Sequence, residues 1–145
     1  MFVLGIDPGL SITGYGVIEA NGRGMSAVTA GVIRTNPADP IGRRLFELAS
    51  DLDAVLGDYP VTEAAIEEVF VNRNLHSVMA VGRAAGVAIL AIARAGIEVA
   101  EYTPSAVKLA VAGSGDAAKQ QVQTMVSRRL GLTAAPKPAD ASDAL

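Results

Sequence analysis

The sequence is poor in several residue types that mark particular classes of protein. It has no cysteine, no tryptophan and a single histidine among 145 residues. The absence of cysteine excludes a disulfide framework and any chemistry that depends on a thiolate. Aromatic residues make up only 4% of the chain, so aliphatic side chains and alanine must supply the hydrophobic core.

Long apolar runs and clusters of basic residues are also missing. The longest apolar region, at residues 81–92, is interrupted by Arg83, and we therefore predict no transmembrane helix. No basic leader precedes the apolar N-terminal run, so a signal peptide is not predicted and a cytoplasmic location is expected. The net charge of -3 counts against a broad nucleic-acid-binding surface, although a local basic patch is still compatible with it.

The hydrophobic content and the patterns of strands and helices are typical of one globular domain of the α/β class, covering residues 1–145. Half of the residues are hydrophobic, and an Asn21-Gly22 pair between two apolar stretches predicts a β-hairpin. Three hairpin-linked strands followed by alternating strands and helices indicate one mixed sheet covered by helices. The patterns predict strands at residues 2–7, 13–20, 25–35, 62–70 and 97–102, and helices at 40–57, 75–95, 103–112, 117–130 and from 139 onward.

Acidic residues occur where ligand sites often form. Asp7 ends the first predicted strand, Glu67 and Glu68 end the fourth, and Asp140 and Asp143 share one face of the last helix. Strand ends that open onto one edge of the sheet would bring these acids together. Because adjacent strand residues point to opposite faces, the pattern does not choose between the two glutamates.

Clustered carboxylates would repel one another unless a cation lay among them, and oxygen-only ligands favour Mg²⁺ or Mn²⁺. Two such ions are the usual device for hydrolysis of a phosphodiester. Each acid also has a plainer interpretation. Asp7 would suit a turn before Pro-Gly, the two glutamates a solvated strand end, Asp140 a helix N-terminus and Asp143 the surface.

Five segments together resemble the RuvC family of bacterial Holliday junction resolvases, within the ribonuclease H-like superfamily. They run in family order over essentially the whole chain. The segments are "GIDPGLSITGYGVIE", "AIEEVF", "GRAAGVAILA", "YTPSAVKLAVAGSGDAAKQQVQTMV" and "KPADASDAL". The resemblance implies a ribonuclease H-like fold, a five-stranded mixed sheet with helices on both faces. It also implies that the last helix is cut short here, since family members continue it.

The resemblance further implies the roles of individual residues. The catalytic and metal-binding acids would be Asp7, which would bridge two metals, together with Glu67, Asp140 and Asp143. The cofactor would be Mg²⁺, two ions per subunit, with Mn²⁺ able to substitute. The residues that serve DNA binding would be Phe70, Lys108 and Lys119.

The implied reaction is paired, symmetric cleavage of four-way junction DNA that leaves 5′-phosphate and 3′-hydroxyl ends, in recombination and repair. Two matched cuts need two matched sites, which a two-fold symmetric homodimer provides. The apolar helix at residues 75–95 is the candidate interface, with Ala84, Ala85 and Gly86 allowing close helix contact. The alternative is that this helix belongs only to the core of the monomer, and the sequence does not separate the two. The RuvA–RuvB branch-migration complex is the partner that the resemblance implies.

Three other interpretations share part of this pattern. The "D-x-G-x-x-x-T-G" opening also resembles the phosphate loop of the sugar kinase, Hsp70 and actin superfamily, but 145 residues cannot hold its two domains. The YqgF-type nucleases share the opening and lack the "VKLAVAG" and "DAAKQQV" segments. A protein that binds DNA junctions without cutting them would not need all four acids.

Overall fold

The described part of the chain follows the element order that the sequence predicts. The computed structural model describes residues 1–68, 74–134 and 136–145. The elements are β1 (Phe2–Asp7), β2 (Ile12–Asn21), β3 (Gly24–Arg34), α1 (Ile41–Asp58), β4 (Glu63–Glu67), α2 (Leu75–Arg94), β5 (Val99–Tyr102), α3 (Pro104–Ala112), α4 (Lys119–Arg129) and α5 (Ala139–Ala144). The predicted α/β fold class is confirmed.

The five strands form one mixed sheet in the order β3-β2-β1-β4-β5. β1, β2 and β3 are antiparallel neighbours, whereas β4 and β5 run parallel to β1. Since parallel strands end at the same edge of a sheet, the last residues of β1 and β4 come out side by side. This topology gives the protein an edge at which two acidic strand ends meet.

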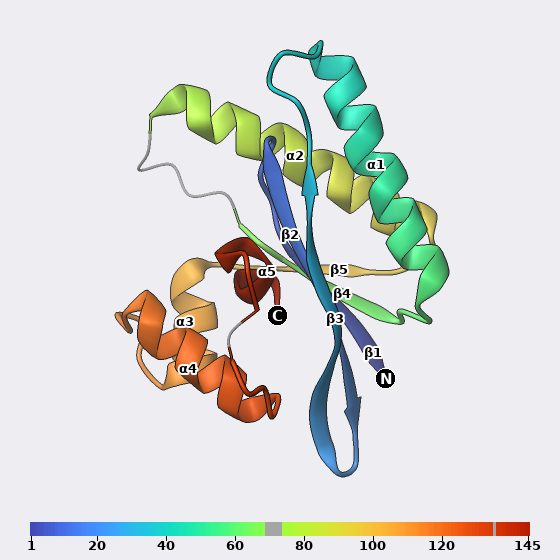
Figure 1. Cartoon of the computed structure of the whole chain (residues 1–145). Coiled ribbons are helices and arrows are strands. Elements are labelled where there is room, and N and C mark those ends of the chain that lie inside the picture. Colours follow the sequence, from blue (N-terminus) through green and yellow to red (C-terminus); the bar gives the residue numbers. More distant parts are fainter. Residues whose placement is uncertain (69–73, 135) are drawn as a thin grey trace.

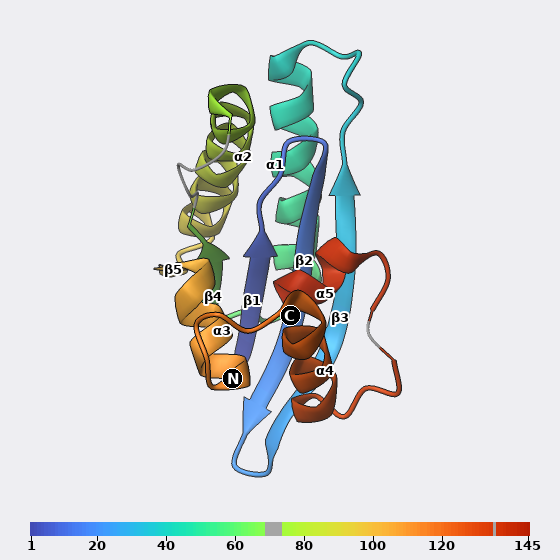
Figure 2. The same ribbon diagram turned by 90° about the vertical axis from the view of Figure 1, so that its left-hand side faces the viewer.

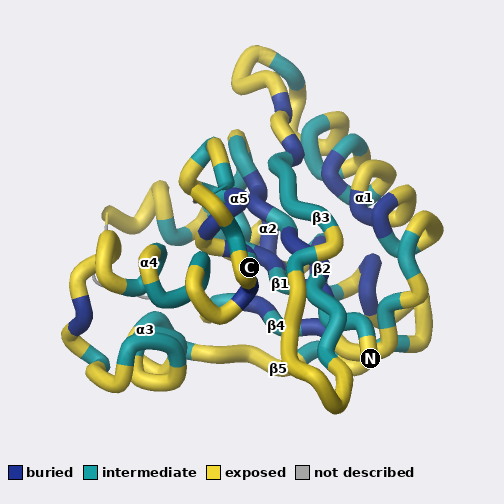
Figure 3. The backbone as a smooth tube through the Cα atoms, turned by 60° about the horizontal axis from the view of Figure 1, so that its bottom comes forward, coloured by how far each residue is buried: buried dark blue, intermediate teal, exposed yellow. Residues whose placement is uncertain are grey.

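Helices cover both faces of the sheet, as Figures 1 and 2 show. α1 and α2 pack together on one face, and α3, α4 and α5 lie on the other. The buried core, dark blue in Figure 3, lies mainly on the α1–α2 side, where Leu4, Ile6 and Val17 of the sheet meet Leu48 and Leu52 of α1. The face under α5 has a different composition and carries the acids.

Local signals explain where several helices begin and end. The side chain of Asn74 accepts a hydrogen bond from the Ser77 amide at the start of α2, and Thr103 caps α3 in the same way. Pro104 occupies the first turn of α3, where its missing N–H has no cost. Gly113 ends α3 in the left-handed conformation, with φ 79°.

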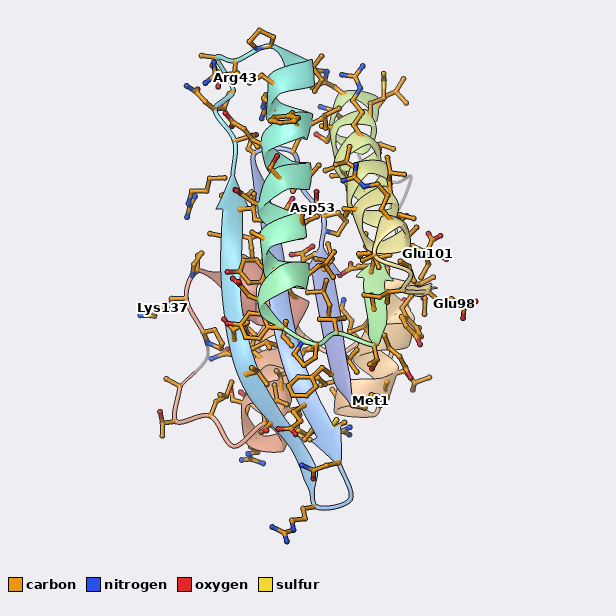
Figure 4. All side chains as sticks on the ribbon, turned by 90° about the vertical axis from the view of Figure 1, so that its right-hand side faces the viewer. Met1, Arg43, Asp53, Glu98, Glu101 and Lys137 are labelled. Atoms are coloured by element: carbon orange, nitrogen blue, oxygen red, sulfur yellow. The ribbon has the colours of Figure 1, made fainter. Side chains whose placement is uncertain are left out.

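The edge of the sheet formed by β5 is short and charged. β5 has four residues, and Glu98 and Glu101 project from this edge into solvent (Figure 4). Short edge strands with charged side chains discourage pairing with another chain.

α2 is more apolar than the sequence analysis allowed for. By length and composition alone it would be able to cross a membrane, with a mean hydropathy of 1.7, and only 28% of that span is buried. Its inner residues nevertheless pack into the core of this chain. Ala84 and Ala85 are among them, so the prediction that these two alanines face a partner is wrong, because their side chains are already covered by the protomer itself.

Candidate active site

Asp7 and Glu67 lie at the adjacent ends of β1 and β4. The recorded register pairs Gly5 with Ala65 and Ile6 with Ile66, so the next residues along the two strands are Asp7 and Glu67. Both point to the face of the sheet that carries α5, since side chains alternate between faces and Ile6 and Ile66 belong to the core on the other face. The two acids therefore open onto one side of the molecule.

The same alternation separates Glu67 from Glu68. Glu68 is exposed, and its backbone amide donates to the carbonyl of Tyr102 over 2.8 Å. The tertiary structure thus decides a question that the strand pattern left open. Only Glu67 lies on the face that Asp7 shares.

α5 supplies the other two acids by lying across the strands. It contacts β1, β2 and β3. Its residues Asp140 and Asp143 are three apart and so share one helix face. Carboxylate oxygens of Asp7, Asp140 and Asp143 all lie within 4.8 Å of one another. Asp7 is thereby brought into one cluster with two acids that follow it more than 130 residues later in the sequence.

Glu67 and Asp143 also line a cavity of about 260 Å³ between the sheet and the helices of this face. Most of the other lining residues are apolar or glycine, among them Val3, Ile18 and Val107. The acids thus lie beside an apolar wall, which lowers the local dielectric and strengthens electrostatic interactions within the cluster.

The electrostatics of the cluster appear most clearly at Asp7. The pKa of Asp7 is raised from 3.8 to about 7, mainly by burial and then by the charges of Glu67, Asp143 and Asp140, and the Lys119 ammonium lowers it in part. A carboxylate that is reluctant to ionise beside three other acids is a group that a bound cation would stabilise. The donor set consists of oxygen atoms alone, which fits Mg²⁺ or Mn²⁺.

One cation of the protein already faces the cluster. The Lys119 ammonium, at the start of α4, donates to Asp143 Oδ2 over 2.8 Å. This hydrogen bond, together with the charge of the same carboxylate, raises the pKa of Lys119 despite some desolvation. The predicted site residue Lys119 is therefore at the acids.

The other two predicted DNA-binding residues are placed differently. Lys108 lies half-buried on α3 and makes no ion pair or side-chain hydrogen bond with the described residues. Phe70 falls outside the described residues. For both, the predicted role stays a prediction.

A hydrogen-bond network fixes the loop that follows Asp7, and the sequence analysis did not find it. The Thr13 hydroxyl donates to the Gly9 carbonyl over 2.5 Å. Arg44 of α1 donates to Ser11 Oγ and to Thr35 Oγ1, each over 3.0 Å. The loop is thus tied both to β2 and to α1. The only sequence signal for Arg44 was its place in an Arg-Arg pair, which is too common to point to a site.

Comparison with known proteins supplies the family context. The sequence model of the family described as "Crossover junction endodeoxyribonuclease RuvC" matches residues 3–145. Proteins of that name from Heliobacterium modesticaldum and Salinispora arenicola are 50% and 49% identical over 145 and 146 residues. Both alignments cover 100% of this chain, and they cover 90% and 83% of the two relatives respectively.

Solved structures give the same picture. The structure of Thermus thermophilus RuvC superposes with a TM-score of 0.92 at 36% identity, covering 99% of this chain and 89% of that one. T. thermophilus RuvC in complex with a Holliday junction substrate gives 0.90 at 33% identity, with coverages of 99% and 88%. The yeast mitochondrial Holliday junction resolvase Ydc2, at 14% identity and a TM-score of 0.64 over 98% of this chain and 75% of that one, shares the fold.

Proposed function

The chain belongs to the RuvC family of crossover junction endodeoxyribonucleases, and from this premise we propose how its acidic cluster performs the reaction. The protein is an endonuclease that acts on Holliday junctions in recombination and repair. Water attacks a backbone phosphorus, the bond from phosphorus to the 3′-oxygen breaks, and the products carry a 5′-phosphate and a 3′-hydroxyl. Cleavage is paired and symmetric across the junction.

The observation that carries the proposal is the convergence of acids from three distant segments. Asp7, Asp140 and Asp143 have oxygens within 4.8 Å of one another, and Glu67 contributes the largest charge effect on the pKa of Asp7. These four residues are the proposed catalytic and metal-binding set. Asp7 is the proposed shared ligand, because each of the other three acids raises its pKa.

Family membership implies the use of a divalent metal, and we assign two Mg²⁺ ions per subunit, with Mn²⁺ as a substitute. When bound, a pair of such ions supplies Lewis-acid stabilisation of the attacking and leaving oxygens of an in-line displacement. The four acids would hold these ions, and the positive charge would offset the repulsion between the carboxylates. Lys119 donates a hydrogen bond to Asp143 and orients its carboxylate.

Junction binding is proposed to use a few placed cations and one aromatic ring. Lys119, Lys108 and Phe70 are the assigned contacts. Because the chain has a net charge of -3, attraction for DNA must be local. Binding should therefore weaken steeply as salt increases, since each phosphate contact releases counterions from the DNA.

A cleavage assay on a synthetic four-way junction tests the assignment of Asp7. We expect paired nicks from the parent in Mg²⁺. The Asp7→Asn variant should bind the junction with unchanged affinity and cut it at least about 10³-fold more slowly, since it loses charge at the centre of the site. Asp51→Asn, an exposed acid of α1, is the matched control and should cut normally. Parental cleavage by Asp7→Asn would contradict the role given to that residue.

A homodimer formed through the outer face of α2 is proposed as the source of the second active site. Leu75, Met79 and Leu90 on this helix are 71%, 52% and 57% exposed. Gly82 and Gly86 lie among them on this exposed side, and no atom lies within 4 Å of where their Cβ would be. Small residues that the protomer itself does not require leave room for a second helix to approach.

Leu90→Glu tests this interface. The charge should shift the dimer to monomer in sedimentation equilibrium and convert paired nicks to uncoordinated single ones, because burying an unpaired carboxylate is costly. Phe46→Glu on α1 is the control, since Phe46 is 72% exposed on a different helix. A Leu90→Glu protein that remains dimeric would reject α2 as the interface.

The wider setting follows from the family. We propose a cytoplasmic protein that works with the RuvA–RuvB branch-migration complex, and one nuclease domain over residues 1–145. The support for this is that the alignments with the Heliobacterium modesticaldum and Salinispora arenicola proteins, both named crossover junction endodeoxyribonuclease, cover 90% and 83% of those proteins.

A further inference from the structure

Three glycines lie directly beneath the helix that carries two of the acids. Gly5 on β1 and Gly14 and Gly16 on β2 all point to the face that α5 covers. A Cβ at Gly5 would meet the carbonyl of Ala144, and a Cβ at Gly14 would meet the carbonyl of Asp140. Both contacts would fall well inside 3.0 Å, a distance that real Cβ atoms essentially never show.

The backbone conformation does not account for these glycines. The glycines with positive φ among the described residues are Gly24, Gly96, Gly113 and Gly131, and none of them belongs to this group. Glycine inside a strand weakens the strand, because it offers no side chain to pack and loses more entropy on folding. Space for an approaching backbone is the remaining physical reason.

The atoms that a methyl group would strike belong to the backbone of α5 itself. At Gly14 they include the carbonyl of Asp140, one of the clustered acids, and at Gly5 the carbonyl of the residue next to Asp143. A backbone cannot rotate out of the way as a side chain can, so the whole helix would have to lift by about 1 Å or tilt. Lifting α5 would move Asp140 and Asp143 away from Asp7, which is fixed to β1.

We propose that Gly5, Gly14 and Gly16 form a glycine seat that sets the height of α5 above the sheet, and thereby sets the spacing of the four acids for divalent cations. They act as positioning residues and touch neither metal nor DNA. The inference rests on the proposed metal-dependent function of this cluster and adds the device that builds it. A displacement of about 1 Å at such a site is enough to cost on the order of 10²-fold in rate.

The three positions predict a graded series. At Gly16 a Cβ would meet the side chain of Leu145, with its closest atom at 2.6 Å. That side chain can move, whereas the obstacles at Gly5 and Gly14 are backbone. Alanine at position 16 should therefore disturb the site least, and alanine at positions 5 and 14 should disturb it most.

Calorimetric titration of the folded, DNA-free protein with Mn²⁺ tests the seat directly. Gly5→Ala and Gly14→Ala should weaken Mn²⁺ binding by about tenfold or more, and Gly16→Ala by a few-fold, because the carboxylates no longer converge. Junction binding measured without metal should change less than about twofold in all three, since none of the assigned DNA contacts, Lys108 of α3, Lys119 of α4 and Phe70, belongs to α5 or to the two strands that carry the glycines. Parental Mn²⁺ affinity in folded Gly5→Ala and Gly14→Ala would overturn the proposal.

Two controls separate positioning from general damage. Gly42→Ala on α1, where no atom lies within 4 Å of the added Cβ, should bind Mn²⁺ as the parent does. Leu52→Ala removes a fully buried core side chain on the opposite face; it should lower the melting temperature and leave Mn²⁺ affinity unchanged. Equal loss of Mn²⁺ affinity in Leu52→Ala would mean that instability alone explains the glycine variants, and the seat would be rejected.

A rescue experiment covers the case in which Gly5→Ala or Gly14→Ala does not fold. Gly16→Ala combined with Leu145→Ala removes the side chain that the new methyl would strike, and the double variant should regain most of its Mn²⁺ affinity. No recovery would count against the seat. If the parent binds Mn²⁺ but does not cut four-way junctions, the proposed function fails while the seat stands.

Discussion

The two faces of the sheet are built from alternate residues of the same strands, yet they follow opposite rules. On β1 and β2, Leu4, Ile6 and Val17 point to the α1–α2 side and are almost fully buried. Gly5, Gly14 and Asp7 point to the α5 side. One face is filled by large side chains and stabilises the fold. On the other face, glycines leave room for a helix backbone to approach the strands. Acids from the strands and from that helix come together there.

This contrast shows how one sheet separates stability from function. The α1–α2 face removes apolar area from water, which favours folding by about 25 cal/mol for each Å² buried. The α5 face brings like charges together, which disfavours folding unless a cation is present. Substitutions on the two faces should therefore affect stability and activity in opposite ways, and three measurements test this difference.

The largest effect on stability is expected at Leu52. Its side chain is 0% exposed in the core between α1 and the sheet. Leu52→Ala should lower the free energy of unfolding by about 3 kcal/mol, the usual cost of the lost burial and the cavity left behind. Urea denaturation measures the change. Cleavage by the remaining folded protein should be normal, and a strong loss of specific activity would contradict the separation of the two faces.

An effect of opposite sign is expected at Asp7 in metal-free protein. Its pKa is raised from 3.8 to about 7 in the folded state, so the folded chain binds this proton more tightly than the unfolded chain. The resulting stabilisation is complete below about pH 4 and is lost as the pH rises through about 7. Asp7→Asn has no proton to lose and avoids this loss.

The measurement is a pair of urea unfolding curves in chelator at about pH 5 and about pH 8. Asp7→Asn should exceed the parent by about 2 kcal/mol at the higher pH and by much less at the lower one. Adding Mg²⁺ should stabilise the parent and not the variant, which reverses the order. If the free energy of unfolding of the metal-free parent changes with pH in the same way as that of Asp7→Asn, then the pKa of Asp7 is not raised in the folded protein.

The smallest effect is expected at Ser142, which lies on α5 and is 3% exposed. Among the described residues, its buried hydroxyl has no hydrogen-bond partner. Ser142→Ala should raise the free energy of unfolding by about 1 kcal/mol, because a buried unpaired hydroxyl is costly. Thermal unfolding detects this change. Cleavage should be unaltered, and destabilisation would mean that the hydroxyl has a partner in solution.

Much of the architecture was readable in the chain. The hairpin near Asn21-Gly22 and the helices predicted at residues 40–57 and 103–112 each depend on residues a few positions apart. The structure has these elements within about one residue of the predicted places, and the turn itself is formed by Gly22 and Arg23. The acids were located as candidates for the same reason. The resemblance of the chain to one family came from five segments in a fixed order rather than from any single acidic residue.

Other features depended on contacts that a one-dimensional pattern does not contain. The strand pattern could not choose between Glu67 and Glu68, and the prediction that Ala84 and Ala85 face a partner was wrong. Alanine suits a helix–helix interface and a tight core equally well, so its identity does not tell which it serves. The Lys119–Asp143 ion pair joins residues 24 positions apart, beyond the reach of any local rule.

The order of strands and helices and the presence of acids at strand ends could be read from the chain alone, because these features follow from the conformational preferences of neighbouring residues. Packing in three dimensions was needed to bring Asp7 to Asp140 and Asp143, to turn Glu67 rather than Glu68 toward them, and to place glycines beneath α5. Those facts depend on strand register and on the height of one helix above the sheet. Both are set by packing between segments that are far apart in the chain.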